Sequence, residues 1–308
     1  MREATVPDPG WAALLGDVEG LRVHHWDLTG PPPSPGVGFV VPPLGRNERL
    51  PRLGEVAGLQ VVQVVTAGFD HVLAHLPDAV TLCNAAGVHD AATAEFAVTL
   101  ILAAQRGIPD LVRAQDRGEW LPLQVAPSLA DRRVLIVGYG RIGQALARRL
   151  APFEVSLTAV ASTARPGADG VVEWVHGMAE LPMLLPQHDI VVLLTPLLPA
   201  TRGLVDAAFL AALPDGALLV NISRGPVVDT DALVAETSSG RLRAALDVTD
   251  PEPLPPGHPL FHTPGVLVAP HRGGAADSFT PRMLALLRDQ LARYAVGAPL
   301  LHVVRPGH

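Results

Sequence analysis

The sequence predicts an α/β protein that contains two parallel-sheet units. Short apolar runs alternate with helix-forming and turn-forming segments in two separate series, which is the pattern of βαβ units. A long apolar helix, residues 91–106, stands between the two series. The chain has 308 residues, which is enough for two such units with a core each.

The composition is that of a globular protein and argues against several other classes. Hydrophobic residues make up 48% of the chain and charged residues 17%, as in globular domains. The net charge of -7 argues against a nucleic-acid partner. No apolar run reaches the length of a membrane span, and the N-terminus lacks the pattern of a secretory signal. The single cysteine, Cys83, excludes an internal disulfide and fits a cytoplasmic location.

All 23 basic residues are arginines, because the sequence contains no lysine. Schiff-base chemistry and a Walker-type phosphate loop both need an amine, so both are excluded. Any anion site must therefore use arginine side chains or backbone N–H groups.

The first series comprises four apolar runs that read as buried strands, with helices expected near residues 49–56 and 69–76. The proline-rich stretch 31–36 is expected to be a loop. The last helix, 281–294, could pack on either unit. The expected strands are residues 21–28, 37–43, 59–65 and 80–86.

The second series opens with RRVLIVG and continues through four further apolar runs, at residues 156–160, 189–194, 216–223 and 266–270. Another strand is expected just before Asp247. The first strand runs into the glycine motif GYGRIG, whose residues are Gly138, Gly140, Arg141, Ile142 and Gly143. Its glycines allow a tight turn, close approach of a pyrophosphate, and contact between helix and strand. A helix follows and offers its N–H groups to the phosphates. The motif predicts a Rossmann dinucleotide-binding unit.

An acidic side chain usually ends the next strand of such a unit, where it binds the adenine ribose. Here the strand is expected to end at Ala161, and Ser162, Thr163 and Arg165 follow. Hydroxyl groups and a guanidinium suit a 2′-phosphate. The sequence favours NADP(H) and leaves NAD(H) possible, with Arg165 then merely solvated.

Three more strand ends carry charged side chains. Arg224 follows one apolar strand, Asp247 follows the next with Glu252 five residues on, and His271 ends another. The carboxyl ends of parallel strands share one edge of a sheet, so these side chains can converge there.

With these motifs in place, the chain resembles the D-isomer-specific 2-hydroxyacid dehydrogenase family. The resemblance spans most of the chain, through residues 64–72, 84–98, 137–143, 194–205, 221–233, 246–255 and 269–274. It implies two lobes, with a Rossmann cofactor lobe of residues 98–272 inserted in a flavodoxin-like substrate lobe of residues 1–97 and 273–308. It also implies a homodimer through the cofactor lobe, with residues 108–130 in the dimer arm. Trp120 either anchors that arm near a neighbouring active site or packs in a core.

The resemblance also implies a role for each site residue. His271 would be the general acid, because imidazole titrates near neutrality. Glu252 would hold the imidazole and raise its pKa. Arg224 would bind the substrate carboxylate, as would the backbone N–H groups of Ala67 and Gly68.

Four further residues would contact the cofactor, in addition to the glycine motif and to Ser162, Thr163 and Arg165. Asp247 would accept from the nicotinamide carboxamide, although it could instead be a helix or turn cap. Thr195, Pro196 and Ile222 would lie along the cofactor.

Glu252 favours a hydroxy acid, because formate dehydrogenases of this superfamily carry glutamine there. We therefore expect reduction of a small 2-oxo acid of the glyoxylate or hydroxypyruvate type. Reduction of a bulkier 2-oxo acid with NADH, or a dinucleotide-sensing role like that of C-terminal binding corepressors, stays open. No metal is expected, because the spacing of His24, His25, His258 and His262 matches no metal-ligand pattern.

Overall fold

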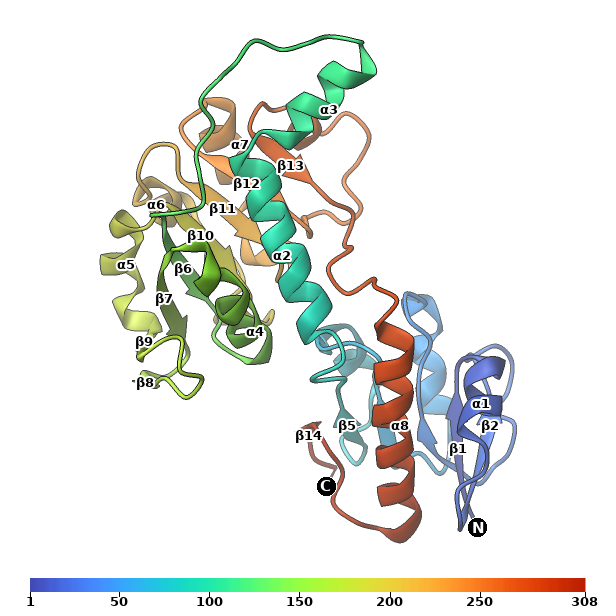
Figure 1. Cartoon of the computed structure of the whole chain (residues 1–308). Coiled ribbons are helices and arrows are strands. Elements are labelled where there is room, and N and C mark those ends of the chain that lie inside the picture. Colours follow the sequence, from blue (N-terminus) through green and yellow to red (C-terminus); the bar gives the residue numbers. More distant parts are fainter. Residues whose placement is uncertain (308) are drawn as a thin grey trace. The chain divides into compact units, whose positions relative to one another are not determined.

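The computed structural model describes residues 1–307 and divides the chain into two compact units. The first unit is Met1–His89 together with the C-terminal segment from Ala276, and the second unit is Asp90–Ala275. The limits expected for the two lobes were 97/98 and 272/273. Both units are α/β, as the sequence predicts (Figure 1).

The first unit is a six-stranded sheet with the strand order β14-β5-β4-β3-β1-β2. The first five strands along the chain are parallel and follow the order 2-1-3-4-5, which is flavodoxin-like, while β14 pairs antiparallel with β5. Its elements, with η for a 3₁₀ helix, are β1 (Arg2–Val6), α1 (Pro9–Leu15), β2 (Leu21–His25), β3 (Val37–Val40), η1 (Asn47–Glu55), β4 (Val61–Gln63), η2 (Asp70–His75), β5 (Thr81–Cys83), α8 (Phe279–Val296) and β14 (Val303–Arg305).

Adjacent residues of one strand in this sheet belong to different cores. Val61 packs with α1 and α8 on one face, whereas Val62 packs with η1 and η2 on the other. The alternation follows from the two-residue period of a strand, and it makes the strands apolar on both faces. The C-terminal helix α8 lies along this sheet (Figure 1). The residue pattern alone left the packing of α8 open, whereas the resemblance placed residues 273–308 in the substrate lobe.

The second unit is an eight-stranded sheet with the order β13-β12-β11-β10-β6-β7-β9-β8. When the antiparallel β8 is left out and the strands are numbered from β6, the run β9-β7-β6-β10-β11-β12 has the 3-2-1-4-5-6 order of a Rossmann fold. Only the two-residue strand β8 is antiparallel. Its elements are α2 (Asp90–Gln105), α3 (Ile108–Asp116), β6 (Arg133–Val137), α4 (Arg141–Leu150), η3 (Ala151–Phe153), β7 (Ser156–Ala161), β8 (Arg165–Pro166), β9 (Trp174–Gly177), η4 (Met178–Glu180), α5 (Leu181–Leu184), η5 (Leu185–Gln187), β10 (Ile190–Leu193), α6 (Ala207–Ala211), β11 (Leu218–Asn221), η6 (Gly225–Val227), α7 (Thr230–Ser238), β12 (Arg243–Leu246), η7 (Pro259–Phe261) and β13 (Val266–Val268).

Four strands lie outside the apolar runs that predict the others: β1, β8, β9 and β14. The strands β8 and β14 are only two and three residues long. β1 begins with the charged pair Arg2 and Glu3, and β9 is only four residues long and contains His176. Neither has the continuous apolar run that marks a buried strand. Their place in the sheets is set by pairing with β2 and β3 for β1, and with β7 for β9.

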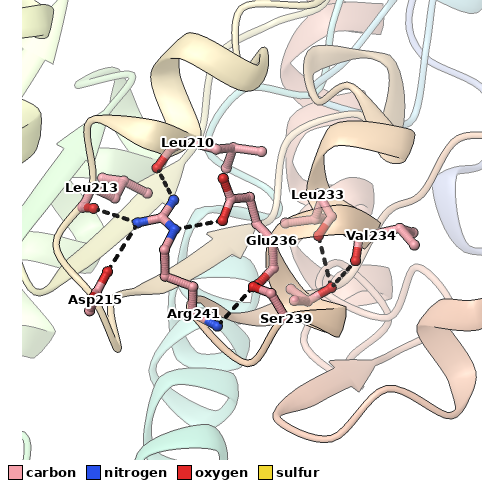
Figure 2. Close-up of polar contacts among 9 residues, drawn as sticks. Leu210, Leu213, Asp215, Leu233, Val234, Glu236, Ser239 and Arg241 are labelled. Carbon is pink, nitrogen blue, oxygen red and sulfur yellow. Dashed lines mark hydrogen bonds and ion pairs between the residues drawn. The ribbon is translucent and has the colours of Figure 1, made fainter.

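Arg241 lies at the amino-terminal edge of the second sheet, just before β12 begins. Its polar contacts are drawn in Figure 2. Its guanidinium donates to the Leu210 and Leu213 carbonyls at 2.7 and 2.8 Å, and to Glu236 at 2.6 Å. These bonds tie the end of α6 to α7 and to the turn before β12. The hydrogen bond with Glu236 raises the pKa of Arg241, with burial opposing it.

A cavity of about 230 Å³ opens at the same edge, and none of the predicted site residues lines it. In the part of the chain that the structure describes, no helix is long and apolar enough to cross a membrane.

Candidate functional site

The predicted site residues of the second unit gather at the carboxyl-terminal edge of its sheet. The strands β6, β7, β10, β11, β12 and β13 are parallel to one another, so the loops that follow them emerge at one edge. The glycine motif follows β6, which lies at the point where the strand order reverses between β7 and β10. Ligands of open α/β sheets bind at such a switch point.

His271 and Glu252 form an ion pair. His271 Nδ1 lies 2.6 Å from Glu252 Oε1, and both side chains are a little under half exposed. The hydrogen bond with Glu252 raises the pKa of His271 against the opposing effect of burial. The same bond lowers the pKa of Glu252. The pair therefore favours imidazolium beside carboxylate, and it leaves Nε2 as the ring atom that can transfer a proton.

The backbone turn that presents His271 is held by Asp247. His271 has a φ of 53°, which is the left-handed region, and its N–H donates to the Asp247 carbonyl at 2.8 Å. The Asp247 carboxylate accepts from the N–H groups of Arg272 at 2.5 Å and Gly273 at 3.0 Å. Burial raises the pKa of Asp247, and these two N–H groups oppose the rise. Asp247 is thus a turn acceptor, which was one of its two expected roles, and it determines where the imidazole stands.

Arg224 is held by a buried asparagine that the sequence reasoning overlooked. The Asn221 side chain is 1% exposed; its oxygen accepts from the Ser223 N–H at 3.0 Å and from the Ser223 hydroxyl at 2.6 Å. Its amide donates to the Arg224 carbonyl at 3.1 Å. A Cβ on Gly225 would overlap the Thr249 carbonyl, so this turn packs directly on the loop that leads to Glu252. A polar residue closing the apolar run LLVN was the available signal for Asn221.

The positive charge of Arg224 affects the pKa values of Glu252 and His271. It contributes to the lowered pKa of Glu252 and counteracts part of the raised pKa of His271. The structure thus brings Arg224, Glu252 and His271 into one electrostatic group. A cation for a carboxylate and a proton donor stand at one sheet edge, which is what reduction of a 2-oxo acid requires.

The glycines of the motif have the geometry of a dinucleotide cradle. Gly138 has a φ of 109°, and a Cβ there would meet Leu194 backbone atoms at 2.5 and 2.7 Å. A Cβ on Gly143 would overlap the Gly138 carbonyl. By contrast, a Cβ on Gly140 would meet nothing within 4 Å, and Gly140 immediately precedes the N-terminus of α4. Open space before a helix N-terminus accommodates a pyrophosphate.

Thr195 supplies an independent observation that a dinucleotide fits. It follows β10, is 6% exposed, and its hydroxyl has no hydrogen-bond partner within residues 1–307. Buried hydroxyl groups are nearly always paired, so an orphan beside Gly138 indicates a bound group. Nearby, Ile222 is buried and Pro196 is exposed.

Arg141 and Ile142 begin α4. The Arg141 side chain is engaged by Asp90 at 2.9 Å, so its expected contribution to a dinucleotide is its backbone N–H.

The strand β7 ends at Ala161, so no carboxylate stands at the usual ribose position. Ser162 and Thr163 are exposed. Arg165 is half-buried and donates to the Thr163 carbonyl at 3.2 Å and to the Tyr139 carbonyl at 2.9 Å. No carboxylate in the described part of the chain pairs with Arg165, so its charge is available to an anion.

The remaining predicted residues lie elsewhere. Ala67 and Gly68 belong to the first unit, in the loop after β4, where their carbonyls accept from Asn84 and Thr66. Trp120 is 98% exposed, so it does not pack in a core of this chain. Among residues 1–307, His, Cys, Asp and Glu side chains form no group of three that could hold a metal.

Comparison with known proteins agrees with this geometry. Residues 98–273 match the family model of the D-isomer specific 2-hydroxyacid dehydrogenase NAD binding domain. The glyoxylate reductase/hydroxypyruvate reductase of Mus musculus is 36% identical over 303 residues, covering 93% of this chain and 91% of the mouse protein.

Two solved structures share the fold over nearly the whole chain. A D-isomer specific 2-hydroxyacid dehydrogenase from Xanthobacter autotrophicus, in complex with NADPH and MES, has a TM-score of 0.81 at 33% identity, covering 98% of this chain and 97% of that one. An NADPH-dependent glyoxylate/hydroxypyruvate reductase from Sinorhizobium meliloti, in complex with NADP and sulfate, has a TM-score of 0.81 at 28% identity, covering 99% and 98%. The chain therefore belongs to the D-isomer-specific 2-hydroxyacid dehydrogenase family and is an NAD(P)-dependent oxidoreductase.

Proposed function

We propose that this enzyme reduces a small 2-oxo acid of the glyoxylate or hydroxypyruvate type to the D-2-hydroxy acid, with NADPH as the reductant. The observation that carries the proposal is the 2.6 Å pair of His271 and Glu252 at the sheet edge that also holds Arg224. The relatives named glyoxylate/hydroxypyruvate reductase support the substrate class.

The chain's own residues account for binding and for the proton. Arg224 binds the substrate carboxylate and polarises the 2-oxo group. His271 gives its Nε2 proton to the carbonyl oxygen of the 2-oxo group, and Glu252 stabilises the imidazolium before transfer. When bound in the cradle formed by the glycine motif, NADPH would supply the hydride, and with the proton from His271 this would balance the conversion of the carbonyl group to an alcohol. Asp247, through the 271–273 turn, holds the donor in place.

The choice of NADPH rests on the turn after β7. Ala161 does not repel a 2′-phosphate, and the guanidinium of Arg165 has no carboxylate partner in the described residues. The two structural relatives carry NADPH and NADP. NAD(H) remains the alternative cofactor.

Initial rates test both parts of the proposal. Glyoxylate, hydroxypyruvate, pyruvate and a bulky 2-oxo acid are each reduced with NADPH and with NADH. We expect the highest kcat/KM with NADPH and one of the two small substrates. Faster reduction of the bulky acid would overturn the substrate class, and a preference for NADH would overturn the cofactor choice. Tight dinucleotide binding without turnover would favour the sensing role.

We further propose a homodimer formed through residues 108–130. In this stretch Trp120, Leu123 and Val125 are almost fully exposed, at 98%, 99% and 100%. Apolar side chains so exposed indicate an interaction surface. Light scattering should give twice the 32.3 kDa of the chain, and serine at Leu123 and Val125 together should give the monomer. A cytoplasmic location stays a prediction that cell fractionation tests.

A further inference from the structure

The residues proposed to bind the 2′-phosphate lie in a segment, residues 162–165, that has little regular secondary structure. Ser162 and Thr163 are exposed, and Arg165 begins β8, a strand of two residues that pairs only with β9. A recognition site needs its side chains held in place before the ligand arrives. Something outside the segment must therefore fix it.

Tyr139 is that anchor. It lies between two glycines of the motif, is 2% exposed, and packs with Val172 and Val175 in the core of the second unit. Its hydroxyl donates to Asp169 Oδ2 at 2.5 Å, and its carbonyl accepts from Arg165 at 2.9 Å. Tyr139 of the glycine motif therefore forms hydrogen bonds with Arg165 and with Asp169.

Asp169 is itself fixed by the backbone. Its Oδ1 accepts from the N–H groups of Val171 at 3.1 Å and Val172 at 3.2 Å. Burial acts to raise the pKa of Asp169, but the Tyr139 hydroxyl and these N–H groups outweigh it and lower the pKa. The carboxylate is therefore charged, which makes the bond from Tyr139 a strong one.

The same bond separates two opposite charges. Asp169 is four residues from Arg165, yet the two side chains form no ion pair in the described structure, because Asp169 is turned to Tyr139. A freed carboxylate could neutralise Arg165 and would repel a phosphate.

We propose that Tyr139 and Asp169 are positioning residues for cofactor specificity: their hydrogen bond holds the 162–165 turn in the geometry that binds a 2′-phosphate and keeps Arg165 unneutralised. This inference rests on the proposed use of NADPH. It concerns a side chain of the glycine motif that is not needed for pyrophosphate binding, which uses backbone N–H groups.

The direct test is binding of two adenosine fragments that differ only in the 2′-phosphate. Calorimetry gives the Kd of 2′,5′-ADP and of 5′-AMP for the wild-type protein, Tyr139→Phe and Asp169→Ala. Phe keeps the buried ring and removes only the hydroxyl, whereas Asp169→Ala removes the acceptor without touching the ring. We expect the preference for 2′,5′-ADP to fall by about tenfold in both variants, as for loss of a hydrogen bond to a charged group. AMP binding should stay unchanged.

The other tyrosine of the chain supplies a matched control. Tyr294 is buried in the first unit, and its hydroxyl bonds to Gln60 at 3.0 Å. Tyr294→Phe removes a comparable buried hydrogen bond and should leave the fragment preference intact. In Tyr139→Phe and Asp169→Ala, the ratio of kcat/KM for NADPH to kcat/KM for NADH should fall because KM for NADPH rises. In Tyr294→Phe this ratio should not change.

Each outcome has one meaning. A wild-type protein that binds 2′,5′-ADP no tighter than AMP overturns the NADPH proposal itself. A wild-type preference that survives in Tyr139→Phe or in Asp169→Ala overturns the positioning role while leaving the cofactor proposal standing. An equal loss in Tyr294→Phe also overturns it, because the effect would then be one of general stability.

Discussion

Nδ1 of His271 lies 2.6 Å from Oε1 of Glu252, and the turn that presents the imidazole is closed by a different carboxylate, Asp247. Two carboxylates therefore act on one histidine, one through the ring and the other through the backbone. Glu252 raises the pKa of His271, and Asp247 fixes the backbone at its left-handed φ. Asp247 also contributes to the raised pKa of His271, but the contribution of Glu252 is larger.

Replacing Glu252 with glutamine tests whether the negative charge of Glu252 raises the pKa of His271. His271 must be protonated to give a proton, so kcat/KM for reduction should be constant below its raised pKa and fall as pH rises through it. Glu252→Gln removes the carboxylate that raises this pKa, and the fall should therefore begin at lower pH. The pH profile of both proteins measures this. A profile with an unmoved alkaline limb would contradict the assignment of Glu252.

His271→Ala should remove the proton donor while leaving the dinucleotide cradle intact. We expect kcat for reduction to fall by about 10²–10⁴-fold, because general acid catalysis acts in the transition state. The Kd for NADPH, measured by fluorescence titration, should change little. Unchanged turnover would mean that another group supplies the proton.

Asn221 is expected to act through Arg224. Asn221→Ala leaves the Ser223 hydroxyl, the Ser223 N–H and the Arg224 carbonyl without their partner. The substitution should therefore lower the free energy of unfolding by about 1–3 kcal/mol. It should also raise KM for the 2-oxo acid more than KM for NADPH. Asn221→Asp keeps the acceptor for Ser223 and loses the donor to Arg224. Equal effects on both KM values would show that Asn221 supports only the fold.

Two glycines of one motif should respond differently to alanine. Gly138→Ala puts a Cβ into the Leu194 backbone at a positive φ and should lower the Tm. Gly140→Ala meets no neighbour, so the Tm should hold while dinucleotide affinity falls, because the methyl enters the space left for the pyrophosphate. Melting curves and NADPH titrations separate the two. Loss of stability in Gly140→Ala would refute the open cradle.

Ala161→Asp restores the acid that usually ends this strand. The new carboxylate should repel a 2′-phosphate and accept from ribose hydroxyls, lowering the NADPH-to-NADH ratio of kcat/KM by about tenfold or more. Ala161→Asn has nearly the same size without the charge and serves as the control. If both variants shift the ratio equally, size rather than charge is responsible.

Local chemistry determined much of the molecule. The apolar runs predicted most of the strands, because a buried parallel strand must be apolar on both faces, and the glycines predicted the cradle, because only glycine fits where backbones meet. The strand ends predicted that Arg224, Glu252 and His271 share one edge, since parallel strands end together. The sequence did not predict β1 and β9, because they carry polar residues, or β8 and β14, because they are only two and three residues long. Pairing with neighbouring strands places all four in the sheets.

What only the tertiary structure decided lies in contacts between residues far apart in the chain. Nothing near Tyr139 in the sequence points to Asp169, thirty positions on, and nothing near Asp247 points to the turn at Gly273. Such hydrogen bonds depend on where two loops meet after the sheet has formed. The sequence by itself determined which groups carry the chemistry; the fold decided which buried partners orient them, because orientation comes from packing and not from local pattern.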